Sequence, residues 1–432
     1  MIKKKMFFFC VCLLSVFLAK NGFCAGSGAY RLEVQDAEAL GKGSAFAAQA
    51  DNPSAVYYNP AGLTQLKGKT YVSIGASEVQ PFSVYESTSG NKTERRKQLF
   101  TIPNGFVVSD LGLKKFSFGL GATSYWGLGT FWAEDSFSKY VATKSDVITQ
   151  DAMLTAAYEI NDNISIGVGA DYVRALANKK KKLVQAGGAD GDFQLKGRDK
   201  NSWGYRLSTL YKLNKNHSFG LMYRSAVDLT YKGKVYLNDL NGFGLNYQGI
   251  FGGTSYETDM STKSRLPQSV LLGYCFKPDD KWRFETDLEW MDWSSVKKEK
   301  IDYPSEKNAV RLAILNDGNP IQRDWRAVLS GAFGTEYKVN DNWKLRLGYL
   351  FHKTPIPQGT FDTALPDSTS NTLTLGTGYQ INKNLGLDFA YAAMFFNPRK
   401  INNTVGSSSG VNINGEYRSF INVYMITMTL KL

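Results

Sequence analysis

The chain has 432 residues, a formal net charge of +12 and 43% hydrophobic residues. Only two histidines and four cysteines are present, which argues against a histidine-based triad, a zinc site and a disulfide-stapled scaffold. Its Gly-x-Gly pairs all lack the third glycine of a dinucleotide-binding loop. We therefore expect no catalytic residue, no metal site and no cofactor, and we do not expect an enzyme.

Residues 1–24 are predicted to form a secretory signal peptide. Lys3–Lys5 precede the apolar run Met6–Ala19, and small residues occupy the −3 and −1 positions before a cleavage point that we place ahead of Ala25. Cleavage removes four lysines and no acids, so the formal net charge falls from +12 to +8. Cys275 then remains as the one cysteine, so no intramolecular disulfide can form.

Residues 25–68 form the one long segment after the leader that does not have the pattern of strands. Asp51-Asn52-Pro53 predicts a turn followed by a short helix, because proline is tolerated at the first helical position and Asn or Asp caps it. Asn59-Pro60-Ala61 repeats this device as a rigid corner, since proline fixes its own φ and keeps the preceding residue extended. We expect this segment to be a hatch that packs inside a closed barrel, with a helical cap on a soluble β-protein as the alternative.

Residues 69–432 are predicted to be all-β. Stretches such as Ile164–Tyr172, Trp282–Trp290 and Leu385–Tyr391 place apolar side chains on one face and glycine, serine or charge on the other. A soluble sandwich would have the same period of two, so the alternation alone does not decide between the two folds. The alternation continues to the C-terminus, where Tyr424–Leu432 carries an apolar stripe.

The lengths of the connections separate the two folds. Short turns are predicted at 110–115, 161–163, 214–217, 277–281, 340–342 and 382–384. Long polar connections alternate with them at 86–96, 132–146, 177–201, 233–263, 303–323, 354–371 and 398–416. These connections join fourteen antiparallel strands, and an even number with short turns on one side and long loops on the other is typical of an outer-membrane barrel.

Two further groups of residues fit this transmembrane β-barrel. Aromatic residues at strand ends are predicted to form girdles at the two membrane interfaces: Trp126, Trp132, Trp203, Tyr211, Trp282, Trp293, Trp325, Tyr337 and Trp343. Inward charges are expected to pair with one another and with the hatch, although one arginine could instead hold a ligand head group: Arg206, Arg224, Arg283, Glu285, Asp287, Glu289, Arg346 and Asp388.

Several motifs resemble, in their order and spacing, the FadL/TodX family of outer-membrane transporters for long-chain fatty acids and hydrocarbons. Besides the Asn59-Pro60-Ala61 segment, they are Phe137–Ser145, Leu266–Ser269, Trp290–Ser294, Arg346–Tyr349 and Leu365–Asp367. The resemblance covers nearly the whole mature chain. The chain departs from the family pattern at Lys139, where arginine is usual, and at Leu432, where most such barrels end in phenylalanine.

The resemblance implies a lateral opening in the third strand, Lys115–Thr130, through which a hydrophobic ligand leaves toward the membrane. Gly119 and Gly121 are the candidate residues of this opening, because glycine weakens strand pairing and permits bends. The resemblance also places the Asn59–Ala61 corner beside the opening. Ligand entry is expected to shift Ala25–Leu32 out of the pocket.

We predict an uptake channel in the outer membrane of a Gram-negative bacterium. Long-chain fatty acids or other hydrophobic compounds would diffuse through the hatch-gated barrel and leave it laterally. Candidate ligand-capture residues, with plain loop packing as the alternative, are Phe131, Trp132, Phe137, Tyr140, Tyr236, Leu237, Leu240, Phe243, Leu245, Tyr247, Ile250 and Phe251. A general porin for small polar solutes, or a surface adhesin or structural barrel, is the alternative function, but neither explains the hatch.

The predicted partners follow from this location. They are the hydrophobic ligand, outer-membrane lipids with lipopolysaccharide, and the barrel assembly machinery, which would read the Tyr424–Leu432 stripe. Lys179–Lys182 is expected to be a solvated loop flank, or otherwise a contact for lipopolysaccharide phosphates or fatty-acid carboxylates. We expect a monomer, and an exported barrel is a poor fit for nucleic-acid binding.

Overall fold

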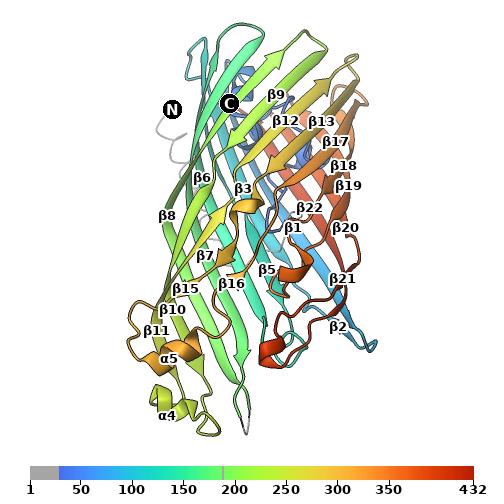
Figure 1. Ribbon diagram of the computed structural model, residues 1–432. Coiled ribbons are helices and arrows are strands. Elements are labelled where there is room, and N and C mark those ends of the chain that lie inside the picture. The colour runs from blue at the N-terminus through green and yellow to red at the C-terminus, as the bar shows by residue number, and fades with distance from the viewer. Residues whose placement is uncertain (1–28, 187–188) are drawn as a thin grey trace.

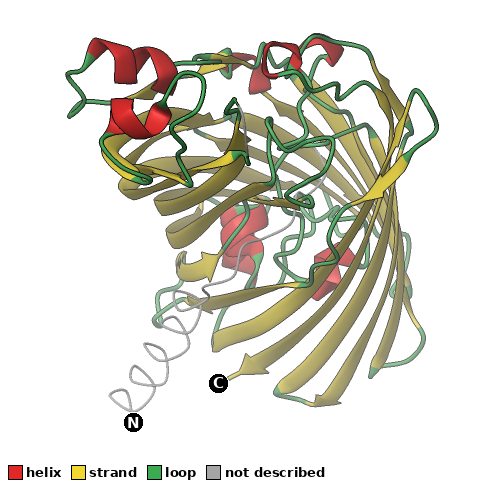
Figure 2. Cartoon of the chain, turned by 90° about the horizontal axis from the view of Figure 1, so that it is seen from below, coloured by secondary structure: helices red, strands yellow, loops and turns green. Residues whose placement is uncertain are grey.

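The computed structural model describes residues 29–186 and 189–432. The predicted signal peptide, its cleavage point and Ala25–Gly28 lie outside the described residues. Antiparallel strands form a closed barrel around a short helical segment (Figures 1 and 2). No helix in the described ranges is long and apolar enough to cross a membrane.

The described wall contains fourteen strands, three of which are interrupted, so that it comprises seventeen segments. The segments are β1 (Thr70–Ser87), β3 (Phe100–Ser109), β4 (Phe116–Thr123), β5 (Gly127–Phe131), β6 (Lys144–Glu159), β7 (Ile164–Leu183), β8 (Gly191–Lys212), β9 (His217–Arg224), β10 (Val227–Asn238), β11 (Tyr256–Leu266), β12 (Ser269–Phe276), β13 (Trp282–Met291), β17 (Val328–Lys338), β18 (Trp343–His352), β19 (Ser370–Asn382), β20 (Leu385–Phe396) and β22 (Gly415–Lys431).

The other elements are short and lie in the hatch or in loops. The hatch contains α2 (Ala37–Leu40), α3 (Ala55–Tyr58) and the 3-10 helix η1 (Pro60–Gln65). The loops contain β2 (Lys92–Glu94), α4 (Tyr247–Phe251), η2 (Trp293–Ser295), β14 (Lys298–Glu299), β15 (Ile301–Asp302), α5 (Ala309–Leu315), β16 (Ile321–Gln322), η3 (Gln358–Thr360), β21 (Arg399–Ile401) and η4 (Ser407–Ser409). In Figure 1, α4 and α5 lie at the end of the barrel opposite the hatch.

The wall closes where the last strand pairs with the first. β22 and β1 are in unbroken antiparallel register from Tyr71↔Lys431 to Ser87↔Gly415. Closure leaves neither the first nor the last strand with a free edge, which is the condition for strands to cross a membrane. The predicted fourteen-stranded barrel is therefore confirmed, and each predicted short turn joins two wall strands.

One predicted connection is largely strand. β7 and β8 stay paired up to Leu183↔Gly191, so most of the stretch 177–201, which was predicted to be a loop, belongs to a long hairpin. Polar and basic residues occupy both faces of this stretch. The alternation of apolar side chains that marks the lipid-facing strands is absent there, so the prediction was wrong at this place.

The outward face of the wall carries an apolar band, as the alternation predicts. Its exposed members include Leu154, Ile166, Val168, Leu207, Leu272, Leu288, Leu347, Leu375, Phe389 and Ile426. The predicted girdle residues Trp203, Tyr211, Trp282 and Trp343 are also exposed on the wall. These residues match the aromatic belts at membrane interfaces.

Four other tryptophans were wrongly predicted to join the girdles. Trp126, Trp132, Trp293 and Trp325 are at most 4% exposed and belong to one buried cluster with hatch residues. A position at the end of a predicted strand does not reveal whether the chain then bends inward. The structure shows that it does so at each of these places.

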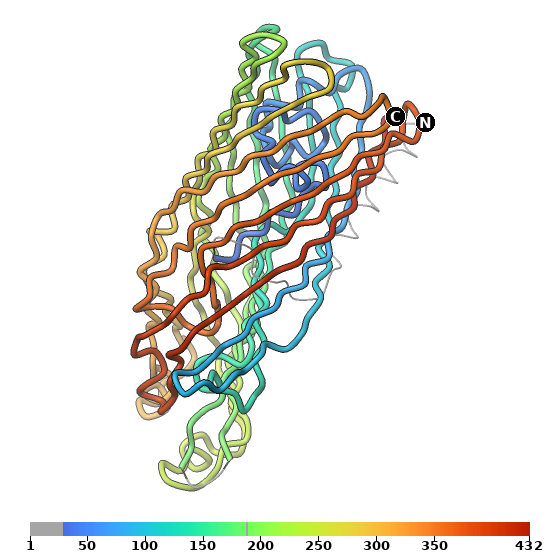
Figure 3. The backbone as a smooth tube through the Cα atoms, turned by 90° about the vertical axis from the view of Figure 1, so that its right-hand side faces the viewer, coloured from blue at the N-terminus to red at the C-terminus, as the bar shows by residue number. Residues whose placement is uncertain are grey.

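The hatch, residues 29–69, packs inside the barrel toward the end that carries the short turns (Figure 3). Asp36 caps α2 by accepting a hydrogen bond from the Ala39 N–H at 3.0 Å. Asn59 caps η1 in the same way through the Ala61 N–H at 3.1 Å, with Pro60 at the first helical position, as predicted. These local caps satisfy donors that the helices cannot satisfy themselves.

Glycines of the wall let the hatch backbone approach closely. A Cβ atom on Gly220 would lie 2.0 Å from the carbonyl oxygen of Ala47. A Cβ atom on Gly348 would lie 2.1 Å from the backbone nitrogen of Gly43. Backbone cannot give way as a flexible side chain can, so the hatch fits only because these positions lack a side chain.

Replacing Gly220 or Gly348 with valine should displace the hatch while the barrel stays closed. Overpacking of this kind costs about 1–3 kcal/mol, enough to raise the population of a displaced hatch about ten-fold or more. Limited proteolysis of the hatch in the folded protein measures this population. Gly331→Val is the matched control, because the nearest atom to a Cβ there is 3.5 Å away. Equal cleavage rates in all three variants would contradict the prediction.

Candidate functional site

Carboxylates that point into the barrel hold the hatch through its backbone. Asp287 accepts hydrogen bonds from the N–H groups of Phe46 and Ala47 at 3.0 and 3.1 Å. Glu285, two residues earlier on β13, accepts from the next two hatch N–H groups at 2.7 and 2.9 Å. Irregular backbone enclosed in a lumen needs partners for such donors, and adjacent inward positions of one strand supply them.

Buried arginines form a second set of contacts. Arg346 lies 2.7 Å from Glu336 and 2.6 Å from Asp388, and its other guanidinium nitrogen lies 3.7 Å from Glu38 of the hatch. Removing one partner from such a buried network is strongly destabilising. The prediction that the inward charges pair with one another and with the hatch is confirmed for Arg206, Arg224, Arg283, Glu285, Asp287, Glu289, Arg346 and Asp388.

The Asn59–Ala61 corner docks on β8. The Asn59 side-chain nitrogen donates to the carbonyl oxygens of Ala47 at 2.7 Å and Thr209 at 3.1 Å. The Ala61 N–H also donates to the Ser208 hydroxyl at 2.9 Å. The corner is therefore bonded to the sixth wall strand, and a Cβ atom on Gly167 of β7 would lie 2.4 Å from the Ala61 nitrogen. Leu63, further along η1, reaches the third strand, where it would lie 3.0 Å from a Cβ atom on Gly119. The bonds to β8 fix this position.

The third wall strand is interrupted between β4 and β5. β4 pairs with β6 up to Thr123↔Asp151, and pairing resumes at Gly127↔Ile148. Three residues of this strand therefore face two residues of β6, and a one-residue excess of this kind bends a strand. Residues 100–104 of β3 pair with β1, but within the described chain they have no strand partner toward β5. We call this interruption of the wall the lateral gap.

Gly119 and Gly121, which were predicted to form the opening, lie in the continuous part of β4 and pair with β3. A Cβ atom on Gly119 would lie 2.5 Å from a methyl group of Val56 in the hatch. In the structure these two glycines make room for the hatch. The lateral gap begins further along the strand, at Ser124.

The N-terminal part of the hatch is bonded to the interrupted strand. The Leu32 N–H donates to the Tyr125 carbonyl at 2.9 Å, and the Gly127 N–H donates to the Tyr30 carbonyl at 2.8 Å. Apolar side chains from the hatch and both flanking strands pack in one buried cluster at the lateral gap, including Leu32, Val34, Phe100, Ile102 and Ile148. The path through the lateral gap is therefore apolar, and hatch residues occupy it.

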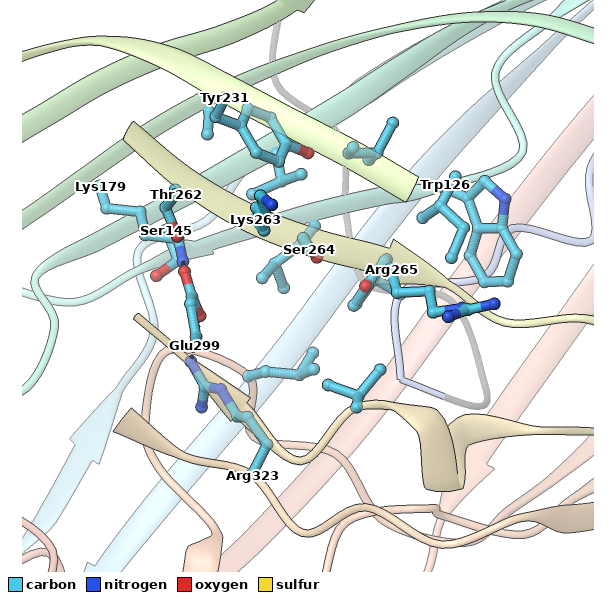
Figure 4. A pocket seen from close by; sticks show the side chains of 18 of the residues that line it. Trp126, Ser145, Lys179, Tyr231, Thr262, Lys263, Ser264, Arg265, Glu299 and Arg323 are labelled. Carbon is cyan, nitrogen blue, oxygen red and sulfur yellow. Dashed lines mark hydrogen bonds and ion pairs between the residues drawn. The ribbon is translucent and has the colours of Figure 1, made fainter. Parts of the chain in front are cut away.

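A cavity of about 480 Å³ lies in the lumen beside this cluster (Figure 4). Trp126 of the interrupted strand lies at one end in Figure 4, and Lys179, Glu299 and Arg323 lie at the other. Most of the remaining lining is apolar or aromatic: Tyr30, Leu128, Val147, Leu229, Tyr231, Leu266, Val296, Trp325 and Leu365. A mostly apolar cavity of this size with a few convergent polar groups has the character of a ligand pocket.

The charged end of the pocket is neutralised within the protein. Glu299 accepts hydrogen bonds from Lys179 and, at 2.9 Å, from Arg323. Arg323 also lies 2.5 Å from Asp362. Burial alone would raise the pKa of Glu299, but the two cations hold it at about 2. Burial raises the pKa of Tyr30 to about 12, so its phenol stays uncharged.

The pocket exists because the chain leaves the wall after Met291. Trp293 is completely buried, and its ring centroid lies 5.1 Å from those of both Tyr30 and Trp325. Residues 263–266 of β11 consequently have no strand neighbour on the β13 side within the described chain. Sequence reasoning missed this infolding and the pocket. The one available signal was the pair of tryptophans in Trp290–Ser294.

The two predicted capture loops lie in separate apolar clusters. In the first, Trp132 is buried and Phe137 stacks on Tyr85 at 3.6 Å between ring centroids. In the second, Phe251 packs against the α5 region, whereas Phe243 and Leu245 are 63% and 70% exposed. The structure does not bring the two loops into one groove, and ligand capture by them stays a prediction.

The residues around the luminal pocket are suited to binding a ligand. Among the described residues, no group of three His, Cys, Asp or Glu side chains is placed to hold a metal ion. His217 shares a hydrogen bond with the Tyr274 hydroxyl at 2.8 Å, and Cys275 is buried in the wall. Neither residue lines the pocket.

A lipid-facing barrel with a plugged lumen, a luminal apolar pocket and a lateral gap defines an outer-membrane channel protein. The family model described as "Outer membrane protein transport protein (OMPP1/FadL/TodX)" matches residues 22–431. The chain belongs to this family.

Known relatives are similar along nearly their whole length. The long-chain fatty acid transport protein of Escherichia coli K12 is 26% identical over 426 residues, covering 90% of this chain and 92% of that protein. Outer membrane protein P1 of Haemophilus influenzae is 21% identical, covering 90% and 91%.

Two solved structures share the fold. The Pseudomonas aeruginosa FadL homologue superposes with a TM-score of 0.79 at 19% identity, covering 93% of this chain and 99% of that one. The Ralstonia pickettii toluene transporter TbuX superposes with a TM-score of 0.71 at 18% identity, with the same coverage.

Replacing Asn59 with alanine should loosen the hatch at its corner. The change removes the hydrogen bonds to the buried Ala47 carbonyl and the part-buried Thr209 carbonyl, at a cost of roughly 1–3 kcal/mol. Hydrogen exchange of the hatch amides should then become about ten-fold faster or more, while the wall amides keep their protection. Asn402→Ala, at an exposed loop position, is the matched control. Unchanged exchange in the hatch would rule out this role for Asn59.

Proposed function

We propose that the protein takes up long-chain fatty acids or other hydrophobic compounds across the outer membrane by diffusion. The observation that supports this most is the apolar pocket, whose lining includes Trp126 of the interrupted strand and Tyr30 of the hatch. A ligand that enters from the outer loops would pass from the pocket to the lateral gap. It would leave into the membrane without crossing the periplasmic water.

The pocket chemistry favours broad selectivity. Each buried methylene contributes about 0.8 kcal/mol, so a long acyl chain binds without specific contacts. Lys179 and Arg323 are already paired with Glu299 and Asp362, so a ligand carboxylate would have to share their donors. Neutral hydrocarbons would meet no such competition. The names of the relatives, a fatty acid transporter and a toluene transporter, include both kinds of ligand.

The N-terminal part of the hatch is the proposed gate. Tyr30 and Leu32 are held by two backbone hydrogen bonds to the interrupted strand, and Leu32 fills part of the lateral gap. A ligand that replaces these apolar contacts favours the state in which the segment has moved away. The alternatives of a porin or an adhesin give neither the hatch nor the pocket a role.

The remaining partners follow from the same proposal. The apolar band faces outer-membrane lipids, including lipopolysaccharide, and the barrel assembly machinery would read the C-terminal stripe Tyr424–Leu432. We expect a monomer, because one chain closes the whole barrel. We expect no catalysis, because uptake by diffusion needs none.

Deletion of Ser124 should abolish uptake. It equalises the residue numbers on the two strands, so the third strand can pair with β6 without a bulge and the lateral gap narrows. Uptake of labelled fatty acid into a host that lacks its own transporter should fall to the background. Deletion of Ser408, in an exposed outer loop, is the control, and heat-modifiable migration on gels verifies folding. Normal uptake by a folded Ser124 deletion would remove the lateral route.

Replacing Glu299 with glutamine should raise the binding affinity for acids but not for neutral ligands. The change frees Lys179 and the Arg323 nitrogen that Glu299 held, while Arg323 stays paired with Asp362. A charge-assisted hydrogen bond from these donors to a ligand carboxylate contributes about 1.5–3 kcal/mol. A fatty acid should therefore bind about ten-fold more tightly, and its methyl ester should bind as before. Calorimetric titration measures both affinities. Glu257→Gln, at an exposed wall position outside the pocket, is the control. Equal changes for acid and ester would show that this end of the pocket does not bind carboxylates.

A further inference from the structure

The outer wall carries a group of cations that the transport route does not use. We define the wall patch as Lys196 and Arg198 on β8 and Lys232 and Lys234 on β10. The strand register sets Lys196 directly opposite Lys234, and Arg198 directly opposite Lys232. All four side chains lie on the outward face of the barrel and away from the luminal pocket.

Two like-charged pairs in adjacent register are an unfavourable arrangement. Like charges directly opposite each other on neighbouring strands destabilise a sheet. Lys234 pairs with Glu257, and Lys196 lies 5.2 Å above the ring of Tyr236. In the described chain, no carboxylate lies within ion-pair distance of Arg198 or Lys232. Lys234 also lies directly opposite Asp259 on β11, so Arg198 and Lys232 carry the positive charge that an external anion can neutralise.

The wall patch lines a groove in the outer surface of about 460 Å³. The backbone of Gly197 and Gly233, which pair with each other across β8 and β10, also lines the groove. Leu176 and Ile148 line it as well, and so does Asp146, which is paired with Lys144 at 3.5 Å. Ile148 belongs to the apolar cluster at the lateral gap. The groove thus combines several cations with apolar surface, which suits an amphiphile with anionic groups and hydrocarbon chains.

The height of the wall patch identifies the layer of the membrane that it meets. Trp203 and Tyr205 are 61% and 51% exposed on β8 and belong to the aromatic girdle on the loop side. Arg198 lies five residues further toward the outer loops, about 16 Å along the strand at roughly 3.3 Å per residue. The wall patch is therefore at the level of lipid head groups in the outer leaflet.

Resting on the outer-membrane lipid contacts of the proposed function, we propose that the wall patch binds the phosphate groups of an outer-leaflet phosphoglycolipid of the lipid A class. Arginine and lysine are the side chains that bind phosphate, arginine as a bidentate donor and lysine as a point charge. The lipid would lie in the groove with its phosphates on the four cations and acyl chains along Leu176. It would then border the lateral gap.

Neutralising the four cations tests this proposal. The variant K196Q/R198Q/K232Q/K234Q is compared with K69Q/K114Q/K215Q/K281Q, which removes four exposed lysines near the opposite end of the barrel. Native mass spectrometry of the purified full chain measures retention of bisphosphorylated lipid A and of the same lipid without phosphates. Heat unfolding on gels, with and without added lipid A, provides a second readout.

We expect the patch variant to retain lipid A at least about ten-fold less well than the unmodified protein, because its charge-assisted contacts are lost. The control variant should match the unmodified protein, and lipid without phosphates should be retained poorly by all three. Added lipid A should raise the unfolding temperature of the unmodified protein only when the patch is intact, because a ligand that binds the folded state stabilises it.

Three outcomes would overturn the proposal. Equal retention by the patch variant would show that the four cations are not the site. An equal loss of lipid A retention in the control variant would show that binding depends on the net charge of the protein and not on the patch. Displacement of lipid A by millimolar inorganic phosphate would show that the patch binds a free anion and not the lipid.

Discussion

The structure depends on one constraint, which is that an irregular backbone enclosed in a barrel must find partners there for its N–H groups. Asp287 and Glu285 each accept two consecutive N–H groups of the hatch between Phe46 and Gln49. A carboxylate can do this without a bulky side chain on the hatch, which explains why the hatch is built from small residues. The same need accounts for the glycines of the wall, since a bond to backbone requires close approach.

The same constraint gives two parts of the hatch different partners. The middle of the hatch is held by buried carboxylates and by Arg346. The N-terminal part is held to the interrupted strand by two backbone hydrogen bonds, from Leu32 and to Tyr30, besides the ion pair of Arg31 with Glu289. The Ala29 N–H also donates to Asp367 at 3.3 Å, and the Tyr30 ring packs against Trp126 and Trp293. The proposed gate therefore has to break a small, defined set of contacts.

Much of the fold could be predicted from the sequence, because a lipid-facing strand must alternate and a turn must carry its own capping residues. The closed barrel, its short turns and the capped corner at Asn59 follow from these local rules. The position of the corner against β8 did not, because it depends on bonds between residues some 150 positions apart. The luminal tryptophans were assigned to the wrong side for a related reason, since Trp126 and Trp293 mark places where the chain leaves the wall.

The interruption of the third strand requires very little change in the chain. Its cause is a single extra residue between Thr123 and Gly127 relative to the facing strand. Among its neighbours it affects β3, whose residues 100–104 have no strand partner toward β5 within the described chain. Such a channel therefore needs only one added residue to interrupt its wall, and the pocket, which depends on the separate infolding after Met291, can differ in chemistry without any change in that residue.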